Sequence, residues 1–269
     1  MRWVSLADDA DLAATSAAIE RDIPVFLDEL TRDHRSHLAE VAPALSWIVH
    51  EEDLPVAVVR AAALRWDGTV EGAPAAGAGE AVTRAGEDGA DTLAVLDVTV
   101  AFGARGRGVG RAVMAELDAR RREQGLARTL LLLRPHRKVD YPLLPFDRYV
   151  SFATSDGEPF DPWLRVAWRL GYRPVRAVQR SLRGRADLAS WERWLGLAVP
   201  GSGPYLVDGA IKPAVIEIER GEGRYREPHL WAGATGSPQP PDADDWIAAL
   251  AAAGVVAGDR SHREGGVLR

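Results

Sequence analysis

The sequence predicts an α/β protein of the α+β type, in which helices flank a central, mixed and twisted sheet. Three observations predict this class. Strand-like and helix-like segments alternate through residues 1–183. The apolar run TLAVLDVTVAF (92–102) leads through a glycine-rich loop directly into a helix-like segment. The run ARTLLLL (127–133) is apolar on both faces, which is typical of a buried central strand.

Composition narrows the function classes. The chain has 269 residues, enough for one large domain or one domain with an appendage, and 46% are hydrophobic. It has no cysteine, which excludes disulfides, thiolate nucleophiles and cysteine-based zinc sites and fits a reducing cytoplasm. A net charge of −6 argues against a general nucleic-acid binder. No apolar stretch approaches the roughly 20 residues that span a bilayer, and no signal peptide is visible. We therefore expect a cytoplasmic protein without DNA or membrane partners.

The N-terminal third predicts a strand, two helices and a hairpin. RWVSL (2–6) is strand-like, and DADLAATSAAIERD (9–22) and FLDELTRDHRSHLAEV (26–41) are helix-like. LSWIVHEEDLPVAVVRAAAL (45–64) has two β-rich runs around a polar turn, which predicts an antiparallel hairpin. Residues 67–91 are rich in Gly, Ala and acidic residues without a period, and predict a long mobile loop.

The middle of the chain predicts a strand–helix–strand unit. Strict alternation along 92–102 divides the strand into two faces: Leu96, Val98, Val100 and Phe102 on one, and Val95, Asp97 and Thr99 on the other. A helix is expected over 108–124, ended by Gly125. Residues 134–162 are rich in proline and aromatic residues and predict irregular structure. The next helix begins with Asp161 as N-cap and Pro162 at its first position.

The remaining elements complete the domain assignment. We expect a strand at 173–182, a helix at 187–196, a hairpin at 214–231 around Gly221–Gly223, and a small helix at 244–256. We assign residues 1–183 to the core domain. Residues 184–232 form a helix-plus-hairpin extension packed on that core, and residues 233–269 form a linker, a short helix and a flexible tail.

The segment FGARGRGVGRAV (102–113) carries four glycines and three arginines where a strand meets a helix. The first N–H groups of a helix lack intrahelical partners, so a helix start attracts anions. Glycines let a large anion touch the backbone, and arginines donate bidentate hydrogen bonds to phosphate. The segment lacks the Lys-Ser/Thr pair of a P-loop, and neither glycine register satisfies G-x-G-x-x-G. The pattern that remains is R-x-x-G-x-G between a strand and a helix, and it indicates a binding site for a diphosphate.

The segment LDVTVAFGARGRGVGRAVMAEL (96–117) resembles the acyl-CoA-binding motif of the GNAT N-acyltransferase superfamily, and the likeness covers residues 1–183. It implies the GNAT fold and coenzyme A or acetyl-CoA as acyl donor. It implies backbone contacts from Val98 and Val100 to the pantetheine arm. It implies a pyrophosphate site made by the following residues: Arg105, Gly106, Arg107, Gly108, Val109, Gly110 and Arg111. Residues 134–231 resemble bacterial GNAT proteins, some of which are fused to carbon–nitrogen hydrolases.

Acyl transfer to an amine requires a base and a group that protonates the leaving thiolate. Asp97 is the candidate base, because an acid inside an apolar strand is costly unless it is used or paired; the alternative is a structural bond to backbone or arginine. Tyr141 and Tyr149 are candidate acids, with ordinary loop packing as the alternative. The position where the family often has a tyrosine, four before Gly171, is Ala167. Another group then protonates the thiolate, or no dedicated acid exists.

Three further residues, Asp147, Arg148 and Trp163, are candidates to shape the acceptor pocket. No metal site is expected, because His34 and His37 lack a third ligand. The expected acceptor is a small-molecule amine, and a homodimer is possible. Two alternatives stay open: a carrier-protein thioester or aminoacyl-tRNA as donor, or a catalytically inactive CoA-binding module.

Overall fold

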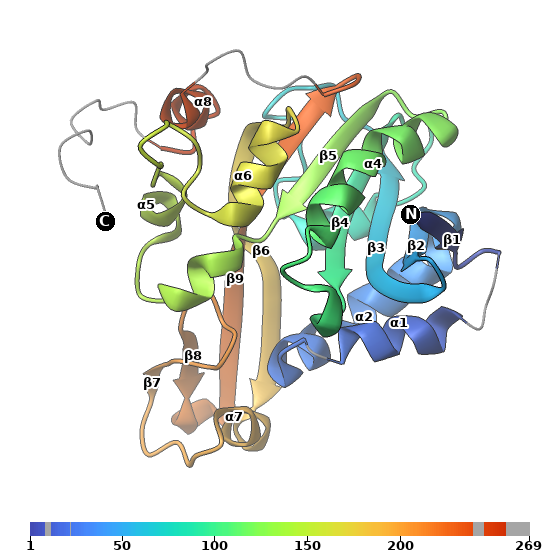
Figure 1. Cartoon of the computed structure of the whole chain (residues 1–269). Helices are drawn as coiled ribbons and strands as arrows, with labels where there is room; N and C mark the ends of the chain where they lie inside the picture. The colour runs from blue at the N-terminus through green and yellow to red at the C-terminus, as the bar shows by residue number, and fades with distance from the viewer. Residues whose placement is uncertain (9–11, 22, 239–244, 257–269) are drawn as a thin grey trace.

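The computed structural model describes residues 1–8, 12–21, 23–238 and 245–256. Within them, one nine-stranded mixed sheet has the order β1-β2-β3-β4-β5-β9-β8-β7, and β6 pairs with β9 (Figure 1). The strands are β1 (Arg2–Ser5), β2 (Ser46–Glu51), β3 (Leu54–Leu64), β4 (Thr92–Val100), β5 (Arg128–Leu133), β6 (Arg173–Asp187), β7 (Gly203–Tyr205), β8 (Ala214–Glu217) and β9 (Glu222–Thr235). The expected mixed sheet is confirmed: β4 and β5 run parallel, and their other neighbours are antiparallel.

Helices cover both faces of this sheet. They are α1 (Leu12–Glu20), α2 (Val25–Val41), α3 (Ala78–Thr83), α4 (Val109–Glu123), α5 (Phe146–Val150), α6 (Pro162–Arg169), α7 (Leu188–Leu195) and α8 (Trp246–Ala252). The largest apolar core joins one face of β2–β5 and β9 to α4, α5, α6 and α8. Smaller clusters join the other face to α1, α2 and α3. Figure 1 shows α4 and α6 side by side in front of the strands.

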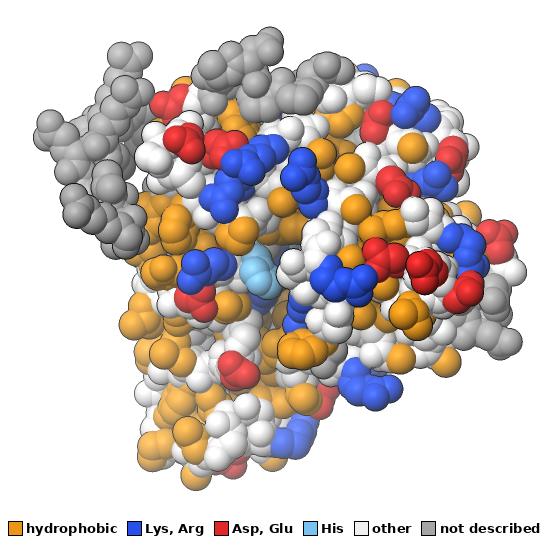
Figure 2. All heavy atoms as spheres, viewed as in Figure 1, with side chains coloured by type: hydrophobic (Ala, Val, Ile, Leu, Met, Phe, Trp, Pro, Cys, Tyr) orange, Lys and Arg blue, Asp and Glu red, His pale blue; other side chains and the backbone are white. Residues whose placement is uncertain are grey.

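The C-terminal boundary differs from the expected one. The sheet does not divide at residue 183, because β9 pairs with β5 from Arg128↔Thr235 to Leu133↔Leu230 and so lies inside the central sheet. The added part is the segment between β6 and β9, which holds α7, β7 and β8 and closes its own core around Phe26 and Trp191. Figure 2 shows hydrophobic side chains gathered toward this end of the molecule. Helix α8 is also anchored, since Trp246 Nε1 donates to Val150 O at 2.7 Å.

Most expected elements before residue 66 and after residue 92 are confirmed. The expected first helix appears as α1, although residues 9–11 and 22 of that prediction lie outside the described residues. The loop expected at 67–91 is corrected: it contains α3, and Ala73, Ala81 and Val82 are buried against the sheet. Small apolar residues carry little periodic signal, which is why the pattern missed them. Among the helices that the structure describes, none combines the length and apolar character that a membrane crossing requires.

Candidate donor cleft and its surroundings

Strands β4 and β5 separate part-way along their length. They pair in parallel only from Thr92↔Arg128 to Val95↔Leu131. Beyond that point β4 stays with β3 as far as Val100, whereas β5 stays with β9. Within the described chain, no strand pairs with the β5-side edge of β4 from Leu96 to Val100, so a ligand can reach that backbone.

A β-bulge lies where the two strands part. Across β3, Ala61 pairs with Val95 but Arg60 pairs with Asp97, so Leu96 is the extra residue. The bulge corrects the alternation expected from the sequence. Val95, Val98 and Val100 all contribute to the core beneath α4 and α6, and Asp97 turns to the other face, where Arg60 lies. A single-residue bulge changes the face of every side chain after it, and the apolar pattern does not reveal it.

The glycine–arginine loop exposes its backbone at the start of α4. Gly106 and Gly108 have φ of +74° and +81°, and a Cβ added at either would meet no atom within 4 Å. Ala112 N donates to Gly108 O at 3.0 Å. In the described part of the chain, no backbone acceptor is found for the N–H groups from Gly106 to Arg111. These groups lie at the positive end of a 15-residue helix, which is the arrangement of an anion site.

The three arginines of this loop are exposed and differ in their contacts. Arg105 Nε donates to Val100 O at 3.1 Å, and its guanidinium lies 5.5 Å from the centre of the Phe102 ring. Arg107 forms an ion pair with Glu51, the last residue of β2. For Arg111, no ion pair or hydrogen bond is found within the described residues. Val109, which the sequence placed in the pyrophosphate site, buries its side chain in the core beneath α4. It can contribute only its N–H.

Asp97 lies in a polar cluster on the α1 face of the sheet. Arg60 Nη1 donates to Asp97 Oδ2 at 3.2 Å, and Thr99 Oγ1 lies 3.1 Å from Asp97 Oδ1. Arg60 also pairs with Glu20 and donates to Ser16 Oγ at 2.7 Å, both on α1. The Asp97 side chain keeps 33% of its surface exposed. It is therefore an accessible carboxylate held in a fixed orientation.

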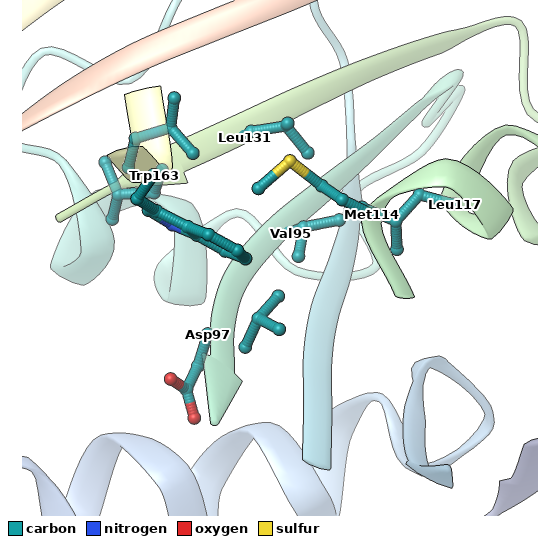
Figure 3. Close-up of a pocket in the computed structure, with 9 residues that line it drawn as sticks. Val95, Asp97, Met114, Leu117, Leu131 and Trp163 are labelled. Atoms are coloured by element: carbon teal, nitrogen blue, oxygen red, sulfur yellow. The ribbon is translucent and has the colours of Figure 1, made fainter. Parts of the chain in front are cut away.

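The opposite face of the same separation holds a small cavity with mostly apolar walls. Its walls are Val95, Asp97, Val98, Met114, Leu117, Leu131, Leu132, Leu133 and Trp163. Figure 3 shows the Trp163 indole reaching toward β4 near Met114, while the Asp97 carboxylate points away from it. The gap between β4 and β5 thus has the cavity on one side and a carboxylate on the other.

Tyr149 is buried and bonded, not exposed to the cleft. Its hydroxyl donates to Asp161 Oδ2 at 2.8 Å, and 1% of the residue is exposed. Burial and the Asp161 carboxylate together raise the pKa of Tyr149 far above its ordinary value. Asp161 is the N-cap of α6, as expected, and also accepts from His136 N and Arg137 N. Tyr149 is thus part of the support of α6, and we leave it out of the proposed catalytic set.

The remaining candidates lie in two other places. Tyr141 packs its ring against Tyr149 and Phe160. Its hydroxyl has no hydrogen-bond partner among the described residues. Asp147 and Arg148 are exposed on α5, and Asp147 lines a second, larger cavity together with Lys138 and Lys212. The structure therefore does not bring them together with Trp163. Ala167 is buried in the core, so no side-chain acid exists at that position.

Sequence reasoning missed a buried polar network on β9. Glu227 is fully buried and accepts from Arg134 Nε at 2.7 Å and from Tyr225 Oη at 2.5 Å. His229 Nε2 lies 2.8 Å from the same carboxylate, and His229 Nδ1 lies 2.9 Å from Ser181 Oγ. Burial raises the pKa of Glu227, but the Arg134 charge and the bonds from His229 outweigh it and hold that pKa well below its ordinary value. The sequence did carry a signal of this network, because Glu227 and His229 stand directly before the apolar pair Leu230 and Trp231 in a strand-like segment.

Comparison with solved structures decides the fold. A GNAT-like decarboxylase, GphF, in complex with isobutyryl-CoA superposes with a TM-score of 0.52 and 18% sequence identity, over 67% of this chain and 90% of that one. The chain has the GNAT fold. The fold expected from the sequence is confirmed. The loading GNAT-like domain of CurA from Lyngbya majuscula also matches, with a TM-score of 0.47, 17% identity, and coverage of 67% of this chain and 87% of that domain.

Sequence comparison adds one curated relative. Arginine N-acetyltransferase avaD from Aspergillus versicolor is 29% identical over 157 residues, which are 52% of this chain and 54% of that protein. The chain thus spans about half the length of the relative it matches. No protein-family model matches the chain.

Proposed function

We propose that this protein is an N-acyltransferase that moves an acyl group, acetyl by default, from acyl-CoA to the amine of a small molecule. One observation carries the proposal. The N–H groups from Gly106 to Arg111, which lack backbone acceptors within the described chain, adjoin an open edge of β4 and the gap between β4 and β5. An anion at the helix start and an extended arm along the strand edge then form one continuous site.

The residues present fit coenzyme A. Its pyrophosphate would lie at the α4 start, where Gly106 and Gly108 leave open space and Arg111 adds charge. Its pantetheine arm contains amides, which pair with strand backbone as a neighbouring strand would. Val98 supplies that backbone on the open edge of β4, and Val100 does so if its carbonyl exchanges the bond from Arg105 Nε for one from the ligand. The thioester would then lie in the gap between β4 and β5.

The gap lets donor and acceptor meet from opposite faces. The amine nitrogen attacks the thioester carbonyl carbon, a C–N bond forms, and the C–S bond breaks as coenzyme A thiolate leaves. We assign Asp97 to orient the amine and to accept the proton that it loses, because its carboxylate is exposed on the α1 face. The thiolate must gain a proton, and the buried Ala167 cannot supply it. Tyr141 or water is the proposed source.

The comparisons support this assignment. The curated relative is named as an arginine N-acetyltransferase, and the GNAT-fold neighbour was solved with isobutyryl-CoA. From these two proteins we infer that this chain also uses acyl-CoA as donor and an amine as acceptor. We also keep the cytoplasm as the proposed location.

Calorimetric titration with coenzyme A tests the donor site. We expect binding by the wild type, and at least about tenfold weaker binding by Arg111→Gln, because a charge-assisted bond to phosphate is lost. The matched control is Arg122→Gln, an exposed arginine at the other end of α4, which should leave the affinity unchanged. A wild type that binds neither coenzyme A nor acetyl-CoA contradicts the proposal. Equal affinities of the two variants would refute the assignment of the loop.

A second candidate, a CoA-binding module without transferase activity, is favoured by one observation. Ala167 stands at the position of the family's tyrosine and is buried, and the Tyr149 hydroxyl is engaged by Asp161. Release of free thiol from acetyl-CoA in the presence of a panel of amines separates the two. Release that depends on an amine supports the transferase; tight binding with no release supports the module.

A further inference from the structure

The closed end of the gap between β4 and β5 is shaped by one aromatic side chain. Most of the cavity walls are aliphatic, and Met114 and Leu117 of α4 are buried in the core, where they have little room to move. Trp163 is the largest wall residue and comes from the opposite helix, α6 (Figure 3). It therefore determines how much of the space between α4 and α6 stays open.

The position of Trp163 is fixed from two sides. Its backbone N–H donates to Asp161 Oδ1 at 2.9 Å in the N-cap of α6. Its ring lies against Gly110 of α4, where an added Cβ would be 3.0 Å from Trp163 Cζ3. The missing side chain at Gly110 makes room for the indole. Contacts with both helices thus fix the position of the ring at the cavity.

We propose that Trp163 sets the length of the acyl group that the protein accepts, restricting it to short chains. This inference rests on the proposed acyl-CoA site. An acyl chain that leaves a thioester in the gap would enter this cavity, whose apolar walls include Met114 and Leu131, and the indole of Trp163 takes up room there. A longer chain would have to displace a ring that is anchored by both helices.

Substitution of Trp163 tests the proposal. Acetyl-, butyryl- and hexanoyl-CoA are compared as donors for the wild type, Trp163→Phe and Trp163→Ala, by the rate of thiol release. We expect the hexanoyl-to-acetyl ratio of kcat/KM to rise at least tenfold in Trp163→Ala and less in Trp163→Phe, since each methylene in an apolar pocket changes selectivity by about tenfold or more. Trp168→Phe is the matched control: it alters a buried tryptophan of the same helix outside the cavity, and its ratio should not change.

Binding provides a readout that does not need turnover. The affinities of S-ethyl- and S-hexyl-CoA thioethers, measured by calorimetry, should show the same change of ratio even in a protein that transfers nothing. An unchanged ratio in a Trp163 variant that still binds coenzyme A overturns the inference. If Trp163→Ala does not fold, the comparison of Trp163→Phe with Trp168→Phe decides the matter. A wild type that binds no coenzyme A overturns the proposed function instead.

Discussion

Arg60 and Asp97 face each other across β3 and β4 beside the bulge at Leu96, and the guanidinium donates to the carboxylate at 3.2 Å. The arginine is buried and also pairs with Glu20, so it cannot follow a moving partner. The bond therefore orients Asp97 without enclosing it. A carboxylate of fixed direction at a gap in the sheet is suited to receive a cationic or hydrogen-bonding amine.

Replacing Asp97 by asparagine tests this role. The change keeps the size of the side chain but removes the base, so we expect kcat to fall by about a hundredfold or more, the usual effect of losing a general base. Coenzyme A affinity should change less than twofold, because the pyrophosphate site is untouched. Thiol release and calorimetry measure the two quantities. Thr99→Val, which removes only a neighbour of the carboxylate, is the control. An Asp97→Asn variant with wild-type kcat would limit Asp97 to a structural bond with Arg60.

The bulge also shows where sequence reasoning reached its limit. The strand, the glycine–arginine loop and the helix after it follow from local pattern, because each depends on neighbours in sequence. The face taken by Asp97 does not, since one unpaired residue at Leu96 reverses the alternation and leaves no trace in composition. The pairing of β9 with β5 joins residues about a hundred positions apart, so no local pattern encodes it. Tyr149 was a plausible acid until its partner, the N-cap Asp161, was placed beside it.

We expect Glu227 to contribute to the free energy of unfolding, and we expect acid to remove that contribution. Its pKa is held below the ordinary value, so the unfolded chain binds the proton more readily than the folded one. The stabilisation is therefore complete above the unfolded pKa of about 4.3 and declines as pH falls below it. At pH 7, Glu227→Gln should lower the free energy of unfolding by about 3 kcal/mol or more, because Arg134 loses its buried partner.

Urea denaturation at pH 7 and at pH 3.5 measures this contribution. The gap between the wild type and Glu227→Gln should be smaller at the lower pH. Glu29→Gln, which breaks a more exposed ion pair with Arg193, should cost at most about 1 kcal/mol at either pH. A gap of the same size at both pH values would contradict the lowered pKa of Glu227.

We expect the Lys138 ammonium to lose its proton in the mildly alkaline range. Its ammonium is buried, donates to Tyr141 O at 2.7 Å and to Ile211 O at 2.8 Å, and lies in the cavity wall that also holds Lys212. Burial first, and the Lys212 charge second, lower the pKa of Lys138 to about 8. Since the unfolded lysine binds its proton more tightly, stability contributed by this group should rise between about pH 8 and pH 10.5.

Labelling with ¹³C-lysine makes this measurable, because the chain has lysine only at positions 138 and 212. The Lys138 side-chain resonance should titrate with a midpoint near 8. Lys212→Gln assigns the remaining signal to Lys138 and should move its midpoint upward, since a like charge is removed. A midpoint above 10 in the folded wild type would contradict the burial of a charged ammonium at this site.

Tyr149 and Tyr141 predict opposite responses to loss of the hydroxyl. Tyr149→Phe leaves Asp161 without one of its donors and should lower the free energy of unfolding by about 1–3 kcal/mol, while kcat stays within twofold. Tyr141→Phe removes a hydroxyl without a protein partner among the described residues, so stability should change by less than about 0.5 kcal/mol. If Tyr141 protonates the thiolate, its variant instead lowers kcat and changes the alkaline limb of the pH–rate profile. Urea unfolding and thiol release on both variants measure these effects. A large loss of kcat in Tyr149→Phe with unchanged stability would return Tyr149 to the catalytic set.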